Sequence, residues 1–219
     1  MKYRLAIFDF DGTLSDSFPW FMRTVNDVAD RYRFRRIDPA DLERLRGMHA
    51  REIVAHLGVP FWKLPLVARH MRARMAVDME GIRLFPGAET MLERLAEGGI
   101  ALAIVTSNSE ANVRRVLGPR AAARIAHYAC GASLFGKRPL LRRVLRAAGV
   151  PASAAVSIGD ELRDLHAARA ERIAFGAVTW GFTAPESLRA HHPEEVFETM
   201  EDVVDTLLSS SSRRAAGEG

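Results

Sequence analysis

The sequence predicts an α/β protein with a doubly wound, Rossmann-like parallel sheet as its core and an inserted small all-helical domain. Three observations support this fold class. Four short apolar runs have the length of strands and are bounded by polar turns. Each run is nearly continuous in apolar residues, as is typical of parallel strands covered on both faces. Helical patterns alternate with these runs, except in one long stretch that lacks a strand.

The expected elements of the core follow one another along the chain. The strands are Tyr3–Asp9, Ile100–Thr106, Ala154–Ile158 and Ile173–Thr179. The helices are Ala88–Glu97, Glu110–Leu117, Pro139–Ala148, Glu161–Ala170 and a last one near Thr199–Leu208. Two glycines, Gly98 and Gly99, end the first of these helices, as glycine commonly does.

The stretch from Ser15 to Arg83 contains no convincing strand and breaks the alternation. Glycine and proline divide it into helical segments near Asp16–Tyr32, Pro39–Leu45, Ala50–Leu57 and Pro60–Asp78. We therefore expect a core formed by residues 1–14 and 84–208 and a helical domain over residues 15–83. The last eleven residues, 209–219, are small and polar, which predicts a disordered tail.

The composition excludes several classes of protein. No apolar run among the 219 residues is long enough to cross a bilayer, and acids interrupt the apolar N-terminus at once. The single cysteine, Cys130, excludes an intrachain disulfide framework and favours a reducing cytoplasm. The net charge is only +4, and the arginines are scattered among acids, so we expect no nucleic-acid and no membrane partner. The seven histidines show no spacing typical of a metal site.

The segment Asp9-Phe10-Asp11-Gly12-Thr13-Leu14 directly follows the first expected strand. In an open parallel sheet, sites form beyond the carboxyl ends of the strands. Residues two apart on extended chain point to the same side, so both carboxylates can face one crevice. Such a pair repels unless a cation lies near it, and Gly12 permits a close backbone approach to a ligand. The alternative is a pair of acids that cap the following helix.

This segment resembles motif one of the haloacid dehalogenase superfamily, in its phosphatase branch. The resemblance implies that Asp9 attacks phosphorus and that Asp11 protonates the leaving group and later activates water. A carboxylate nucleophile would form an aspartyl-phosphate and split one difficult displacement into two steps. The second carboxyl would then shuttle the proton.

Two further elements resemble the family's motifs. Thr106, at the end of the second expected strand, matches motif two, and with Ser107 and Asn108 it would hold phosphoryl oxygens beside a helix N-terminus. The same residues suit a helix cap, a role that does not compete. Lys137 matches the family's lysine, although Arg138 stands where a proline often follows. Its ammonium would contact both the nucleophile and a phosphoryl oxygen.

The fourth element, Gly159-Asp160-Glu161-Leu162-Arg163-Asp164, matches the family pattern G-D-x-x-x-D. The resemblance makes Asp160 a metal ligand, while Asp164 would bind the metal through water or orient Lys137. With Asp9 and the main-chain carbonyl of Asp11, these oxygens suit Mg²⁺ as the cofactor. The alternative is an acidic helix N-terminus favoured by the helix dipole.

The inserted helical segment corresponds to the family's cap. Its sequence around Arg46-Gly47-Met48-His49-Ala50-Arg51 resembles the cap loop of phosphoglycolate phosphatase-like members. Arg46, His49 or Arg51 would meet an anionic group of the substrate, for which a guanidinium is well suited. The alternative for each is a solvated surface residue. One departure from the family is Arg172, which stands where glycine is usual and is expected in a left-handed or altered turn at a cost of about 1 kcal/mol.

Together these motifs predict a Mg²⁺-dependent phosphatase of a small phosphorylated metabolite, with 2-phosphoglycolate as one candidate and a monomer or homodimer as the assembly. A sugar phosphomutase or a pyrophosphatase of the same superfamily remains open. The alternative from another class is a non-catalytic binding protein on this fold, although such a protein would usually have lost an acid of the site.

Overall fold

The computed structural model describes residues 2–78, 81–133 and 136–209. Its core is a six-stranded sheet in the order β5-β4-β1-β6-β7-β8, with every neighbouring pair parallel. The strands are β1 (Leu5–Phe8), β4 (Ala101–Val105), β5 (Ile125–Ala129), β6 (Ala155–Gly159), β7 (Ala174–Val178) and β8 (Glu195–Phe197). The chain leaves β1 toward β4 and later returns to β6 on its other side. This reversal creates a crevice at the carboxyl ends of β1 and β6, where doubly wound sheets bind ligands.

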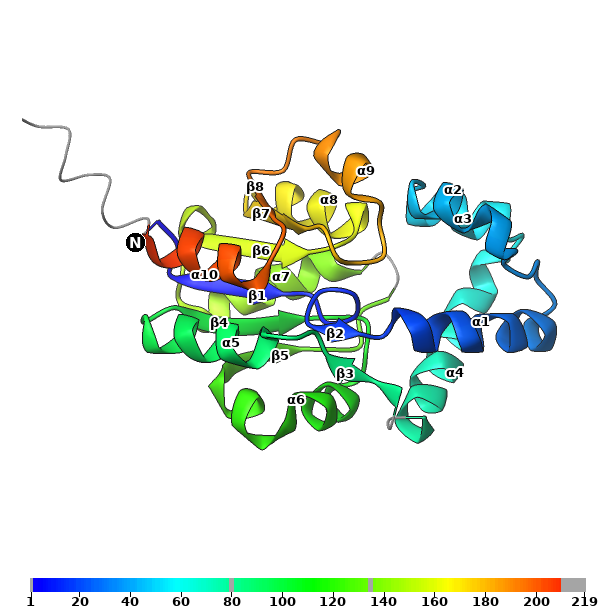
Figure 1. Cartoon of the computed structure of the whole chain (residues 1–219), viewed down its shortest axis with the longest axis horizontal. Helices are drawn as coiled ribbons and strands as arrows, with labels where there is room; N and C mark the ends of the chain where they lie inside the picture. The colour runs from blue at the N-terminus through cyan, green and yellow to red at the C-terminus, as the bar shows by residue number, and fades with distance from the viewer. Residues whose placement is uncertain (1, 79–80, 134–135, 210–219) are drawn as a thin grey trace, which may run out of the picture.

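Helices cover both faces of this sheet (Figure 1). One face carries α5 (Ala88–Glu97), α6 (Glu110–Arg124) and α10 (Met200–Ser209). The other carries α7 (Lys137–Ala148), α8 (Leu162–Ala170) and α9 (Pro185–Arg189). The side chains of β1 alternate between the two layers, and all four are at most 1% exposed. Burial on both faces explains why β1 has an apolar side chain at every position, and the predicted fold class is confirmed.

A helical segment follows β1 and lies beyond the carboxyl ends of the strands (Figure 1). It contains α1 (Phe18–Tyr32), α2 (Leu42–Arg46), α3 (Ala50–His56) and α4 (Leu64–Val77), with short 3-10 turns at Pro39–Asp41 and Phe61–Lys63. Its helices bury an apolar cluster of their own. Where the chain enters and leaves the segment, β2 (Ser15–Asp16) pairs antiparallel with β3 (Arg83–Leu84). Strands of two residues leave no periodic pattern, which is why the sequence predicted no strand at these positions.

The prediction also missed two strands of the main sheet, and both lie at its edges. Only the ends of β5 are buried, and its middle residues include His127 and Tyr128, so the sequence shows no continuous apolar run. The other edge strand, β8, has three residues.

The predicted end of α6 at Leu117 coincides with a break at Gly118, after which helical turns continue to Arg124. Within the described residues no helix is long and apolar enough to cross a membrane. The predicted tail begins at Ser209, which belongs to α10, and its other residues lie outside the described ones.

Arg172, between α8 and β7, adopts the left-handed conformation expected from its position, with φ of 58°. Its backbone N–H donates to the carbonyl of Arg169, and its side chain is exposed. Because an L-residue is strained in this region, Arg172→Gly is expected to raise the free energy of unfolding by about 0.5–1 kcal/mol. Urea denaturation measures this change. The matched substitution Arg143→Gly, in the interior of α7, is expected to lower the free energy by about 1 kcal/mol. A destabilised Arg172→Gly variant would contradict the assignment of strain.

Candidate active site

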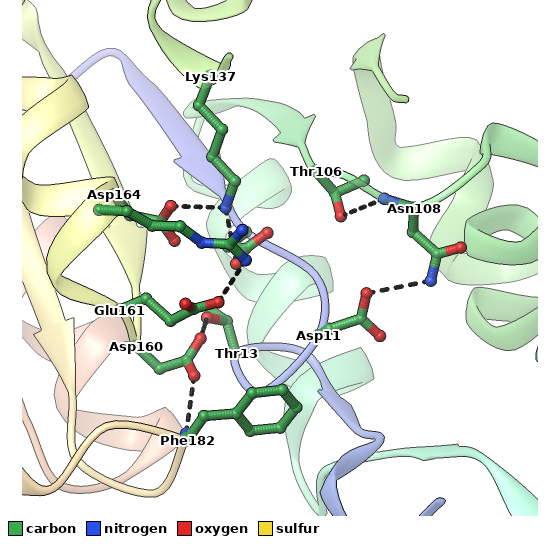
Figure 2. Close-up of polar contacts among 11 residues, drawn as sticks. Asp11, Thr13, Thr106, Asn108, Lys137, Asp160, Glu161, Asp164 and Phe182 are labelled. Atoms are coloured by element: carbon green, nitrogen blue, oxygen red, sulfur yellow. Dashed lines mark hydrogen bonds and ion pairs between the residues drawn. The ribbon is translucent and has the colours of Figure 1, made fainter. Parts of the chain in front are cut away.

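Three buried ionisable side chains meet where β1, α7 and α8 converge. Asp9 directly follows β1, Lys137 is the first residue of α7, and Asp164 lies in the first turn of α8. The Nζ of Lys137 lies 2.8 Å from Oδ2 of Asp9 and 2.7 Å from Oδ1 of Asp164 (Figure 2). All three side chains are at most 6% exposed. The sequence placed these residues in one site, and the structure brings them together.

Electrostatics keep Asp9 ionised in this buried position. Burial alone would raise the pKa of its carboxyl, but the charges of Lys137 and Arg163 outweigh that effect and hold the pKa below its usual value. Burial likewise opposes the charge of Lys137, yet Asp164 and Asp9 raise the pKa of its ammonium. A carboxylate that stays charged in a water-poor site is suited to act as a nucleophile.

Asp11 lies two residues further on and has a different environment. Burial and the charge of Asp9 raise the pKa of the Asp11 carboxyl to about 6. The side-chain amide of Asn108 donates a hydrogen bond of 3.1 Å to Oδ2 of Asp11 (Figure 2). Asn108 is itself fixed, because its backbone N–H donates to Oγ1 of Thr106 at 3.1 Å and its side-chain oxygen accepts from Asn112 at 3.0 Å. A carboxyl with a pKa near neutrality can both donate and accept a proton.

Asp160 follows β6 and is completely buried. Its two oxygens accept hydrogen bonds from the hydroxyl of Thr13 at 2.7 Å and from the backbone N–H of Phe182 at 2.8 Å (Figure 2). Gly12 and Gly181 enclose the same side chain: a Cβ at either would lie within 2.3 Å of an Asp160 atom. Only glycine fits at these two positions, so the backbone of both loops can surround the carboxylate.

Sequence reasoning missed several residues that complete the site. Thr13 and Phe182 hold Asp160, but neither carries a local signal for that role. Arg163 forms a salt bridge with Glu161 and lowers the pKa of Asp9 by its charge. Its position inside the fourth motif was a signal, although the family pattern leaves this residue free. Arg72 on α4 was also missed, and its guanidinium donates to the backbone carbonyl of Ser107 at 3.2 Å.

The donor set fits a hard divalent cation. Asp9, Asp11 and Asp160 present carboxylate oxygens at one edge of the sheet, and the charge of Asp9 raises the pKa of both other acids. Burial is the largest cause of the shift at Asp160, whose pKa rises to about 8. A divalent cation between these carboxylates would offset the repulsion that the charge of Asp9 exerts on Asp11 and Asp160. Oxygen ligands of this kind suit Mg²⁺. Asp164, by contrast, contacts Lys137 at 2.7 Å, as expected of a residue that orients this lysine.

The candidate substrate residues of the cap lie around the same crevice. From the core, Ser107 and Asp11 line a cavity of about 250 Å³ beneath α1 and α4 of the cap. His49 and Arg51 line a neighbouring cavity of about 410 Å³ that reaches Lys137. Arg46 lines a further cavity with Glu161 and Arg163. Its guanidinium donates to the carbonyls of Phe182 at 3.0 Å and Gly181 at 3.3 Å. In this structure Arg46 therefore fastens the cap to the loop that holds Asp160.

The fold and the site together define a doubly wound α/β protein with an acidic centre at the switch point of its parallel sheet. Comparison with known proteins gives the family. The profile of the haloacid dehalogenase-like hydrolases matches residues 6–178, and the chain belongs to this family. The predicted family is confirmed, and so is the prediction that the protein is an enzyme.

Individual relatives agree over nearly the whole chain. A phosphoglycolate phosphatase of Synechococcus elongatus is 32% identical over 204 residues, which cover 92% of this chain and 95% of that protein. A 5′-nucleotidase of Pseudomonas aeruginosa is 29% identical, with 88% of this chain and 90% of that protein covered. A crystal structure of a Lactobacillus plantarum protein has the same fold, with a TM-score of 0.79 and 24% identity over 94% of this chain and 99% of that one.

Proposed function

We propose that this hydrolase is a Mg²⁺-dependent phosphatase of a small phosphorylated metabolite that acts through an aspartyl-phosphate. One observation carries the proposal: Asp9 is buried and kept ionised by Lys137 at 2.8 Å, while Asp11, two residues away, has a pKa of about 6. Two neighbouring carboxyl groups whose pKa values are pushed apart suit a nucleophile and a general acid/base.

In the first step, an oxygen of Asp9 bonds to phosphorus and the bond from phosphorus to the ester oxygen breaks. Protonated Asp11 gives its proton to that leaving oxygen, so the product departs as a neutral alcohol. In the second step, Asp11 accepts a proton from water, the water oxygen bonds to phosphorus, and the bond to Asp9 breaks. Inorganic phosphate leaves, and both side chains return to their starting states.

The remaining side chains hold charges in place during these steps. Lys137 faces Asp9 and can neutralise a phosphoryl oxygen, and we propose that Asp164 orients Lys137. Thr106 and the N–H group of Ser107 would hold phosphoryl oxygens. Asn108 would assist them through its contacts with Thr106 and Asp11. Asp9, Asp160 and the backbone carbonyl of Asp11 would hold Mg²⁺, which neutralises charge on the transferring group.

Two substrate classes are supported by the lining of the crevice. Arg72 reaches the cavity beside Asp11 and would pair with the carboxylate of 2-phosphoglycolate, in agreement with the relative from Synechococcus elongatus. The same cavity is lined by Trp20, Phe21 and Met71, an apolar and aromatic surface that suits the base of a nucleoside monophosphate. The nucleotidase relative makes this the second candidate.

We expect the purified protein to release inorganic phosphate in the presence of Mg²⁺, to lose this activity in excess chelator and to regain it when Mg²⁺ is restored. Comparing kcat/KM for 2-phosphoglycolate, nucleoside 5′-monophosphates and sugar phosphates identifies the substrate class. Isomerisation of a sugar phosphate without phosphate release would support the phosphomutase instead, and preference for pyrophosphate would support the pyrophosphatase. Full turnover without a divalent cation would overturn the proposal.

A further inference from the structure

Three histidines from distant parts of the chain meet at the contact between the cap and the core. His49 precedes α3 in the cap, His166 lies on α8, and His191 follows α9. Each offers one ring nitrogen, and these nitrogens lie within 4.8 Å of one another. The ring centroid of His49 lies 5.5 Å from that of His166 and 5.3 Å from that of His191. The centroids of His166 and His191 are 5.9 Å apart.

Hydrogen bonds orient two members of this cluster. Nδ1 of His191 lies 2.8 Å from the backbone carbonyl of Ser187. Because a carbonyl only accepts, Nδ1 carries the proton, and the other ring nitrogen keeps its lone pair. Histidines that ligate metals commonly donate their second nitrogen in this way. The backbone N–H of His49 donates to the carboxylate of Glu52 at 2.8 Å, which fixes the turn that carries this imidazole.

The charges around the cluster permit a cation there. Several arginines lie nearby, which would disfavour a positive ion if they were uncompensated. However, Arg163 is paired with Glu161, Arg138 with Glu171, and Arg169 is 4.0 Å from Glu194. His166 is exposed and the other two rings are partly exposed, so an ion can enter from solvent.

We propose that His49, His166 and His191 bind a transition-metal ion of the Zn²⁺ class and so fasten the cap to the core. Three neutral imidazoles are a recurrent Zn²⁺ ligand set, with water or an anion in the fourth position. Nitrogens bound to one zinc lie about 3.3 Å apart, since each Zn–N distance is about 2.0–2.1 Å. Small ring rotations therefore close the observed separation. Imidazole prefers this class of metal to Mg²⁺, so the site is chemically distinct from the aspartate centre.

The position of the cluster gives the ion a structural consequence. Hydrogen bonds already join the cap and the core at this place. The N–H of Ala184 donates to the carbonyl of Arg46 at 2.9 Å, and the hydroxyl of Ser187 donates to the carbonyl of Gly47 at 3.0 Å. The carbonyl of Ser187 also accepts the hydrogen bond from Nδ1 of His191, so Ser187 contacts both the cap and the histidine cluster. A bound ion would add metal–nitrogen bonds between cap and core to these hydrogen bonds, and it would favour the docked position of the cap.

The test measures metal binding directly. Chelator-treated full-length protein, supplied with excess Mg²⁺, is titrated with Zn²⁺ by calorimetry and with Co²⁺ by visible absorption. We expect one Zn²⁺ per chain and a Co²⁺ spectrum of nitrogen ligation. Separate His166→Ala and His191→Ala variants are each expected to bind Zn²⁺ at least about 100-fold more weakly. The Asp160→Asn variant, which alters the aspartate centre, is expected to keep the Co²⁺ spectrum.

Matched controls test the specificity of this result. His56→Ala in the cap and His127→Ala in the core remove histidines outside the cluster and are expected to bind Zn²⁺ as the unaltered protein does. Zn²⁺ should also raise Tm and slow amide exchange over residues 46–52 and 184–192 only when the cluster is intact. Circular dichroism without metal establishes that each variant is folded. Absence of Zn²⁺ binding, or binding unaffected in both His166→Ala and His191→Ala, overturns the proposal.

Discussion

Replacing Asp9 with asparagine is expected to reduce phosphate release at least about 10⁴-fold while the protein remains folded. The amide has the shape of the carboxylate but cannot form the bond to phosphorus, so the proposed first step is lost. The fold should survive because Lys137 keeps its contact with Asp164 at 2.7 Å, so its buried charge is not left without a partner. Steady-state phosphate release and thermal denaturation measure the two effects separately.

Two further variants sharpen this result. Asp27→Asn makes the same chemical change at a position of the cap outside the site and should leave kcat unaltered. Asp11→Asn should retain the nucleophile but lose proton transfer, with kcat reduced about 10²–10⁴-fold. If Asp9→Asn kept more than about 1% of the activity, the nucleophile would have to be sought elsewhere.

The main chemistry of the site could be predicted because its residues are local to strand ends. Asp9, Thr106 and Asp160 each follow a buried strand directly. The apolar run identifies the strand, and the polar residue after it therefore lies at the carboxyl edge of the sheet. These three positions, together with Lys137 at the start of α7, occur in the order that indicated the family, and the family profile confirms it.

The residues that support the site could not be predicted, because they depend on contacts between distant segments. Thr13 and Asp160 are separated by 147 positions in the chain, yet they form a hydrogen bond of 2.7 Å. The hydrogen bonds of Arg46 to the core likewise depend on how the cap docks on residues 181–182. The histidine cluster is a similar case: no spacing in the sequence joins His49 to His191, so sequence analysis found no support for a histidine metal site.

The two missed strands of the main sheet have a different cause. Apolar periodicity reports burial, and edge strands are only partly buried. The sequence of β5 therefore lacks the apolar run that identifies β1, although both strands belong to the same parallel sheet. Prediction from pattern succeeds in the centre of this sheet and fails at its margins for this reason.

The second large effect is expected at Lys137. Its ammonium lies between two carboxylates at 2.8 and 2.7 Å and is only about 5% exposed. Lys137→Met leaves Asp9 and Asp164 buried without their cation, so we expect the free energy of unfolding to fall by about 3–5 kcal/mol. We expect kcat to fall at least about 10³-fold, since charge on the phosphoryl group loses its partner. The double variant Lys137→Met/Asp164→Asn should recover part of the stability and none of the activity.

Lys137→Arg tests whether a generic cation would suffice. The chain has 31 basic residues, of which only Lys2, Lys63 and Lys137 are lysines, so arginine serves at almost every other cationic position. A planar guanidinium is wider than an ammonium and cannot occupy the space between two carboxylates without displacing one. We therefore expect Lys137→Arg to lose about 10²–10³-fold in kcat, whereas Lys2→Arg, at a side chain that is 54% exposed, should be nearly neutral. Near-normal turnover of Lys137→Arg would show that charge alone is needed there. The predicted loss would show that the site requires the small, single-centred cation that the rest of the sequence avoids.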